Sequence, residues 1–209
     1  MSFAKDKFVV IKQVISPELT DFIYKYFLMK RTAAYTLHKS NYFADKKHYV
    51  ITGTWGDSQV SDAYSHYSDI VMETLLLKVH PIMEKITKLK LYPSYSYARI
   101  YNKGNVLKRH KDRFSCEIST TLNLGGDNWP IYLEPSGKQN MKGVKIDLKP
   151  GDMLIYRGCD LEHWRDEFKG KLCSQVFLHY NNKKTKNSKK NLFDGRPHLG
   201  LPKYYDKKN

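Results

Sequence analysis

The stretch RHKDRFSCEISTTLNLG, residues 109–125, places a histidine and an acid one residue apart, directly before a β-rich run. On an extended strand, residues i and i+2 point to the same face, so His110 and Asp112 would present an imidazole and a carboxylate together. Residues 118–124 are apolar or β-branched at most positions, which predicts a buried strand. The stretch therefore predicts a sheet that carries two metal-ligand side chains.

Short β-rich runs continue on both sides of this stretch, and no helical period interrupts them. Glycines fall between the runs, where turns need them. Eight short strands without an intervening helix predict a sandwich or jelly roll. The expected strands are 95–101, 106–110, 118–124, 131–133, 144–148, 153–156, 161–165 and 172–180.

The first part of the chain has a different pattern, with one strand followed by helices. A β-branched run at 9–14 precedes Ser16 and Pro17, which are typical of a helix N-cap and first helical position. Residues 31–67 predict loops with a short hairpin, and residues 68–89 predict a second amphipathic helix that is bent or interrupted near Pro81. The predicted fold class is mainly β with flanking helices, an α+β arrangement.

The expected domain organisation is one catalytic unit and a tail. Residues 1–181 form the domain, with the strand and helices in 1–90 and the jelly-roll core in 91–181. Residues 182–209 form a basic C-terminal tail with nine lysines and arginines against two aspartates. The net charge of +15 over 209 residues raises three partner classes to consider, which are nucleic acid, membrane surfaces and acidic substrates.

Cysteine usage and hydropathy indicate the compartment. The three cysteines have no CxxC spacing, so neither a disulfide framework nor a zinc ribbon is expected, and a reducing cytosol is the simplest setting. No apolar run is long enough for a membrane span, and the first residues lack the apolar core of a signal peptide. We therefore expect a soluble cytoplasmic protein without membrane contact. The sequence does not predict its oligomeric state.

A third metal ligand is available from the segment GDMLIYRGCDLEHWRDEF. Its turns return the chain so that His163 points inward from another predicted strand. Two histidines and one carboxylate form a facial triad, which leaves three positions open on an octahedral Fe(II) ion. Zinc prefers a closed tetrahedral set or a single open position, and the residues leave that metal as an alternative.

Three segments resemble the Fe(II)/2-oxoglutarate-dependent dioxygenases, in particular the prolyl 4-hydroxylase-like branch. They are RIYNKGNVLKRHKDR, SCEISTTLNLG and LKPGDMLIYRGCDLEHWRDEFKGKLCSQVFLHY, and FVVIKQVISPELTDFI resembles the entry strand and helix of that branch. The resemblance implies a double-stranded β-helix, with His110, Asp112 and His163 as iron ligands and catalytic residues. It also implies 2-oxoglutarate and O2 as cosubstrates, with ascorbate as a candidate reductant.

The resemblance implies a cation that binds the distal carboxylate of 2-oxoglutarate. The matching position holds Lys171, eight residues after His163. Arg165 is the rival, because it shares the inward face of His163 and a guanidinium binds a carboxylate through two hydrogen bonds. Tyr101 matches a tyrosine that bonds the cosubstrate, and the further candidates on the next strand are Thr121 and Asn123.

The resemblance to prolyl hydroxylases implies a protein or peptide side chain as substrate, with proline as the leading guess. Tyr97 and Arg99 share the face of Tyr101 and are candidate substrate contacts, as is Arg113, which we expect to pair with Glu117. Two alternatives stay open. The basic charge favours a nucleic-acid-directed dioxygenase, such as an oxidative demethylase, and a jelly roll also serves as a non-enzymatic binding module.

Overall fold

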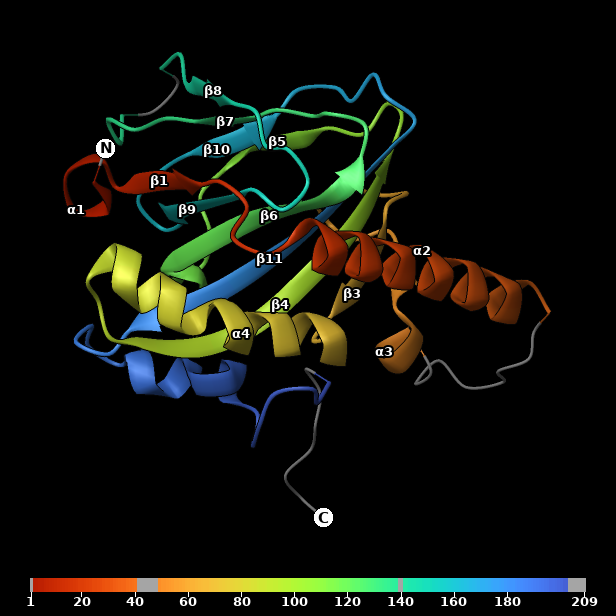
Figure 1. Ribbon diagram of the computed structural model, residues 1–209, viewed down its shortest axis with the longest axis horizontal. Coiled ribbons are helices and arrows are strands. Elements are labelled where there is room, and N and C mark those ends of the chain that lie inside the picture. The colour runs from red at the N-terminus through yellow and green to blue at the C-terminus, as the bar shows by residue number, and fades with distance from the viewer. Residues whose placement is uncertain (1, 41–48, 139–140, 203–209) are drawn as a thin grey trace.

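The computed structural model describes residues 2–40, 49–138 and 141–202 and contains two antiparallel sheets (Figure 1). The larger sheet has the strand order β1-β9-β6-β11-β4-β3-β2, and the smaller has the order β5-β10-β7-β8. This arrangement confirms the predicted jelly roll. The strands are β1 Phe8–Ile11, β2 Thr54–Trp55, β3 Tyr64–Tyr67, β4 Leu91–Asn102, β5 Leu107–His110, β6 Ile118–Gly126, β7 Ile131–Leu133, β8 Val144–Ile146, β9 Met153–Arg157, β10 His163–Arg165 and β11 Leu172–Asn182.

Helices cover the outer face of the larger sheet, as α2 and α4 show in Figure 1. Ser16 caps α2 as predicted, because its hydroxyl accepts a hydrogen bond from the Leu19 amide at 3.2 Å. The helix runs on to Lys39, so the loop predicted from residue 31 is wrong over 31–39. The helical elements are α1 Phe3–Asp6, α2 Pro17–Lys39, α3 Tyr49–Thr52, α4 Ile70–Thr87, and the 3₁₀ segments η2 Phe114–Cys116 and η3 Ser188–Gly195.

The segment expected to be loops with a hairpin does contain a short hairpin. Strands β2 and β3 pair antiparallel, with Trp55 opposite Tyr64. Strand β3 continues the larger sheet by pairing with β4. Positions 41–48 of this segment lie outside the described residues.

The helix α4 is continuous through Pro81, so it is not interrupted there, and the predicted bend stays a prediction. Proline removes one hydrogen bond to the carbonyl of Leu77, but Leu77 lies on the exposed face, where water can bond that carbonyl. The opposite face is buried, with Val79 and Met83 fully covered by the sheet. Burial of that face holds the helix together on both sides of the proline.

Alternate residues of the central strands serve two different cores. On β9, Met153 and Ile155 belong to the core beneath the helices, whereas Leu154 and Tyr156 belong to the core between the sheets. This alternation is the two-residue period of a strand with both faces buried. The same period places polar and aromatic side chains of β4, β6 and β11 in the space between the sheets.

The segment after β11 lies against α4 and β4. The guanidinium of Arg196 is 2.7 Å from a carboxylate oxygen of Glu73, and both side chains are buried. Arg196 also donates to the Leu201 carbonyl at 2.6 Å. The division into a domain and a separate tail stays a prediction. No helix in the described ranges has both the length and the apolar character needed to cross a bilayer.

The Asp152 carboxylate joins the loop after β1 to the turn before β9. It accepts hydrogen bonds from the Gln13 and Lys149 amides at 3.0 Å each, and the Lys12 ammonium lies 2.7 Å away. These contacts outweigh the opposing effect of burial, and the pKa of Asp152 is lowered.

Replacing Asp152 with asparagine is expected to lower the free energy of unfolding by about 1–3 kcal/mol near neutral pH. A lowered carboxyl pKa contributes stability above the unfolded value of about 4 and loses it as the pH falls through the folded value. The difference between the two proteins should therefore shrink below about pH 4. Urea unfolding of both proteins at pH 7 and pH 3 measures this difference in stability. A difference that is larger at pH 3 would contradict a stabilising role for the ionised Asp152 carboxylate.

Candidate metal centre and adjoining pocket

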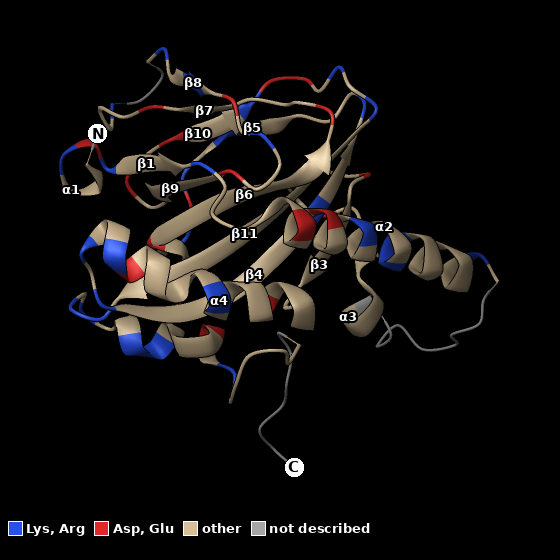
Figure 2. Ribbon diagram, in the orientation of Figure 1, with Lys and Arg blue, Asp and Glu red and all other residues tan. Residues whose placement is uncertain are grey.

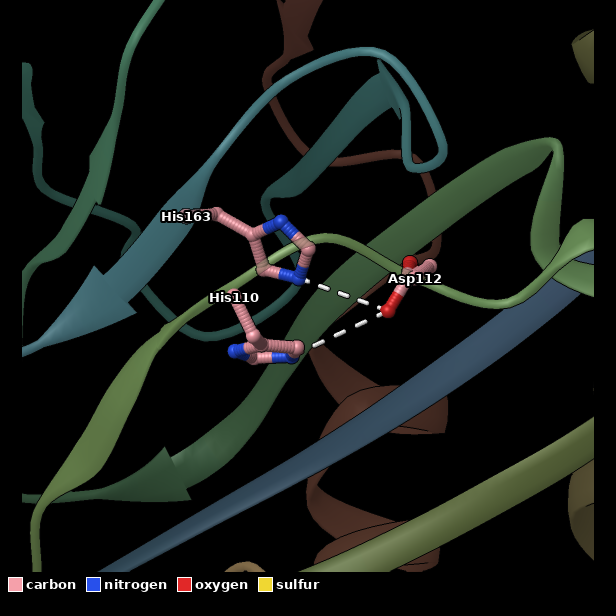
Figure 3. Close-up of side chains that lie close together, drawn as sticks. All are labelled: His110, Asp112 and His163. Carbon is pink, nitrogen blue, oxygen red and sulfur yellow. Dashed lines mark ion pairs between the residues drawn. The ribbon is translucent and has the colours of Figure 1, made fainter. Parts of the chain in front are cut away.

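His110, Asp112 and His163 lie together at one end of the space between the sheets (Figure 3). One potential ligand atom from each residue lies within 4.8 Å of the other two. The Nε2 atoms of His163 and His110 are 3.4 Å and 3.8 Å from Asp112 Oδ1. The sequence predicted this grouping, and the structure brings the three side chains together.

Backbone carbonyls orient both imidazoles. His110 Nδ1 lies 2.7 Å from the Lys108 carbonyl, and His163 Nδ1 lies 3.1 Å from the Leu161 carbonyl. Because a carbonyl only accepts hydrogen bonds, each Nδ1 carries a proton, and Nε2, the ring nitrogen nearer to Asp112, is left as the metal-binding atom. This is the arrangement in which histidine binds a metal.

The contacts that position Asp112 differ from those we predicted. Strand β5 ends at His110, so Asp112 does not lie on a strand, and the two-residue period does not apply to it. Instead its amide donates to the Gly158 carbonyl at 2.9 Å, and Ser119 Oγ donates to its Oδ2 at 2.6 Å.

The electrostatics of the centre favour the ionisation states that metals bind. The pKa of Asp112 is lowered, because His163 and the Ser119 hydroxyl outweigh the effect of burial. Burial and the neighbouring His163 lower the pKa of His110. An ionised Asp112 and a neutral His110 are therefore favoured at neutral pH.

A pocket of about 350 Å³ opens onto these three residues. Its wall combines apolar and aromatic side chains with charged ones at the rim. A second pocket of about 630 Å³ adjoins it, since both share Asp57, Ser58, Tyr95, Tyr97 and Arg113. The first pocket is also lined by Gln59, Arg99, Leu107, Lys111, Cys116, Ile131, Tyr156, Phe177 and His179.

Arg165 is the buried one of the two predicted cations. Its side chain is 1% exposed, and it donates to the Trp129 carbonyl and to Thr121 Oγ1, the latter at 3.3 Å. Its Nε has no hydrogen-bond partner, and no carboxylate within the described ranges pairs with it. Lys171 is exposed, so the structure places only Arg165 inside the barrel.

The other predicted cosubstrate contacts separate into two groups. Thr121 contacts Arg165, and Tyr101 is buried, with its ring 4.8 Å from that of Trp129. The Asn123 side chain, in contrast, bonds to the backbone. Its amide nitrogen donates to the Leu148 carbonyl at 2.6 Å and its oxygen accepts from the Gly125 amide at 3.0 Å, and its contact with the cosubstrate stays a prediction.

The predicted substrate contacts Tyr97, Arg99 and Arg113 all line the pocket. Tyr97 and Arg99 both bond to Asp57, at 2.6 Å for the tyrosine hydroxyl. Asp57 lies between β2 and β3, in a segment whose sequence pattern gave no sign of a role at the site.

The expected ion pair between Arg113 and Glu117 is absent. Arg113 pairs with Asp194 of η3 at 2.9 Å, whereas Glu117 accepts hydrogen bonds from the Asn182 amide and the Thr185 hydroxyl. The sequence pattern could not predict Asp194 as the partner of Arg113, because Asp194 lies far along the chain, in the tail.

Ser119 and His179 are two further residues at the centre that sequence reasoning missed. Each occupies the inward-facing position of its strand, opposite the other in the β6–β11 register. Burial lowers the pKa of His179 to about 4, so this imidazole is neutral. Ser119 could have been predicted, because it lies two residues before Thr121 on the same strand and therefore shares its inward face.

Solved structures with the same fold were found, although no family model and no curated protein matches the chain. A prolyl-4-hydroxylase from Pseudomonas putida has a TM-score of 0.57 at 13% identity, over 87% of this chain and 95% of that one. HygX from Streptomyces hygroscopicus, with nickel, 2-oxoglutarate and hygromycin B bound, has a TM-score of 0.62 at 12% identity, over 87% and 85%. EctD from S. alaskensis with bound Fe has a TM-score of 0.60 at 15% identity, over 95% and 84%. The chain therefore has the double-stranded β-helix fold of these proteins.

Proposed function

We propose that this protein is an Fe(II)- and 2-oxoglutarate-dependent oxygenase that hydroxylates a C–H bond of a protein or peptide side chain. One observation carries the proposal. A His-Asp-His ligand set opens onto a pocket, and two residues after His163 on β10 a fully buried guanidinium has no carboxylate partner among the described residues.

The ligand set suits iron. His110, Asp112 and His163 supply two imidazole nitrogens and one carboxylate oxygen, all within 4.8 Å of one another. A 2-His-1-carboxylate set with open positions is diagnostic of non-haem Fe(II) oxygenases. The two imidazole Nδ1 atoms already bond to carbonyls, which fixes the rings before metal binds.

The guanidinium suits the distal carboxylate of 2-oxoglutarate. Arg165 lies two residues after His163 on β10, so both point between the sheets. A buried cation is costly without an anion, and arginine stays protonated in proteins. The unpartnered Nε of Arg165 would supply an additional contact. The Thr121 hydroxyl holds the guanidinium in place, because it accepts from Arg165 at 3.3 Å and donates its own proton to Gln175 at 3.0 Å.

When bound, iron and 2-oxoglutarate would supply the oxidising chemistry, with succinate and CO2 as coproducts. The protein's residues orient the reactants and keep water out. Leu107, Ile131 and Phe177 give the pocket wall its apolar character. Arg99 is held against Asp57 and Tyr101 in the wall of the pocket.

The two adjoining pockets support a polypeptide substrate. The second pocket leads away from the metal ligands past Tyr95 and Tyr97 and is lined by the edge of the sheet at Thr54 and Ser65. A chain that extends on one side of the reacting residue would occupy both pockets. Proline is the first side chain to test, because one structure with the same fold is a prolyl-4-hydroxylase.

The test is stoichiometric formation of succinate from 2-oxoglutarate that requires Fe(II), combined with a mass-spectrometric screen of peptides for oxygen addition. We expect succinate only with both Fe(II) and 2-oxoglutarate, and oxygen addition on a subset of peptides. Absence of succinate with every peptide and every methylated oligonucleotide would contradict the oxygenase proposal. Oxygen addition to methylated oligonucleotides but to no peptide would mean that the substrate is a nucleic acid and not a polypeptide.

A further inference from the structure

Ser119 lies at the junction of three groups around Asp112. Its Oγ is 2.6 Å from Asp112 Oδ2, 2.9 Å from the Cys116 carbonyl and 3.0 Å from His179 Nδ1. Ser119 is fully buried and His179 nearly so, which means that water cannot substitute for these contacts.

The number of protons decides the direction of these hydrogen bonds. A serine hydroxyl has one proton, and both a carboxylate and a backbone carbonyl can only accept. Whichever of Asp112 and Cys116 receives the Ser119 proton, none is left for His179. A contact between Ser119 and His179 is then a hydrogen bond only if His179 Nδ1 is the donor.

We propose that Ser119 is a positioning residue that holds Asp112 for metal binding and fixes the tautomer of His179. The three residues then form a hydrogen-bond relay. His179 Nδ1–H donates to Ser119 Oγ, and the Ser119 hydroxyl donates to Asp112 Oδ2. It occupies Oδ2 and leaves Oδ1, the oxygen nearest to both histidine ligands, for the metal. This inference rests on the proposed metal centre.

The packing around Asp112 supports a single orientation of its carboxylate. The Asp112 amide donates to the Gly158 carbonyl at 2.9 Å. A Cβ at position 158 would collide with Asp112 Oδ2 and with Ser119 Oγ. The backbone of Gly158 therefore packs closely against both the carboxylate and the serine hydroxyl that bonds to it.

The relay also gives the pocket a defined hydrogen-bond acceptor. Because Nδ1 of the neutral His179 carries the proton, Nε2 has a lone pair. His179 lines the pocket, and no described residue bonds to its Nε2. The substrate group that meets this atom should be a donor, an N–H or O–H, such as a peptide amide.

Manganese binding tests the positioning role without turnover. The matched variants are Ser119→Ala and Ser174→Ala, since Ser174 is equally buried but its hydroxyl has no partner. Electron paramagnetic resonance of Mn(II) under titration should show affinity about 10–100-fold weaker in Ser119→Ala, and within about twofold of wild type in Ser174→Ala. Equal affinity in all three proteins overturns the relay. If wild type itself does not bind Mn(II), the proposed metal centre fails instead.

Nuclear magnetic resonance tests the tautomer in the unmodified sequence. Long-range ¹H–¹⁵N spectra of protein labelled at histidine distinguish protonated from unprotonated ring nitrogens, and loss of one signal set in His179→Asn assigns His179. We expect a protonated Nδ1 and an unprotonated Nε2. The opposite tautomer would contradict the proposed direction of the relay, whether or not Ser119→Ala folds.

Discussion

Replacing His110 with alanine is expected to reduce Fe(II)-dependent succinate formation by at least about 100-fold, more than the loss typical when a group outside the ligand set is removed. The reason is that two remaining ligands, Asp112 and His163, cannot hold the metal as three do. His110 is the best ligand to remove, because its side chain is 25% exposed at the pocket and its truncation leaves no sealed cavity. His163 is almost fully buried, so its removal would also disturb folding.

The matched control is His198→Ala, which removes an exposed histidine far along the chain from the ligand set. It should retain wild-type succinate formation and metal content. Thermal unfolding of both variants within about 3 °C of wild type would show that the loss is local. Turnover that survives in His110→Ala would mean that the ligand assignment is wrong.

The sequence predicted the three members of this centre, but the reason given for one of them was wrong. His163 lies on a strand as expected. Asp112 lies beyond the end of β5, and its place depends on the Gly158 carbonyl, a contact between residues far apart in sequence. A period of two detects neighbours along a strand, but it cannot detect a hydrogen bond that closes a loop.

Most of the fold was predictable because each strand of the β-rich half is marked by its own residues and bounded by turns. The incorrect predictions concern helices whose extent depends on burial against the rest of the fold. Helix α2 extends to Lys39 through Ala33 and Ala34, of which Ala34 is buried. Helix α4 continues past Pro81 because its buried face binds the sheet on both sides of that residue.

The residues that form the rim of the pocket were the least predictable. Arg113 was expected to pair with Glu117 nearby, but Asp194 reaches it from η3. Asp57 similarly reaches Arg99 from the loop between β2 and β3. Such pairs join charges that are distant along the chain, and no local pattern indicates them.

Replacing Arg165 with methionine is expected to weaken 2-oxoglutarate binding by at least about 30-fold, equivalent to about 2 kcal/mol. The substitution removes the buried guanidinium proposed to bind the distal carboxylate, and a carboxylate buried without a cation is strongly disfavoured. Isothermal titration calorimetry of 2-oxoglutarate into the Mn(II)-loaded protein measures the change.

The fold should tolerate this substitution, because two effects oppose each other. The Trp129 carbonyl loses its donor, which costs about 1–3 kcal/mol. Against that, burial lowers the pKa of Arg165, which reflects the cost of keeping its charge inside the barrel, and methionine removes that cost. We therefore expect a small shift in the unfolding midpoint compared with the loss of affinity.

Lys171→Met is the matched control, since it removes the rival cation with the same replacement. Lys171 is exposed, and only its backbone amide makes a described contact, to Asp127 at 2.6 Å. Its removal should change the affinity for 2-oxoglutarate by less than about twofold, the scale of an exposed ion pair. A large loss in Lys171→Met with none in Arg165→Met would reverse the assignment, because the carboxylate would then lie at the open end of β11 and not beside Thr121.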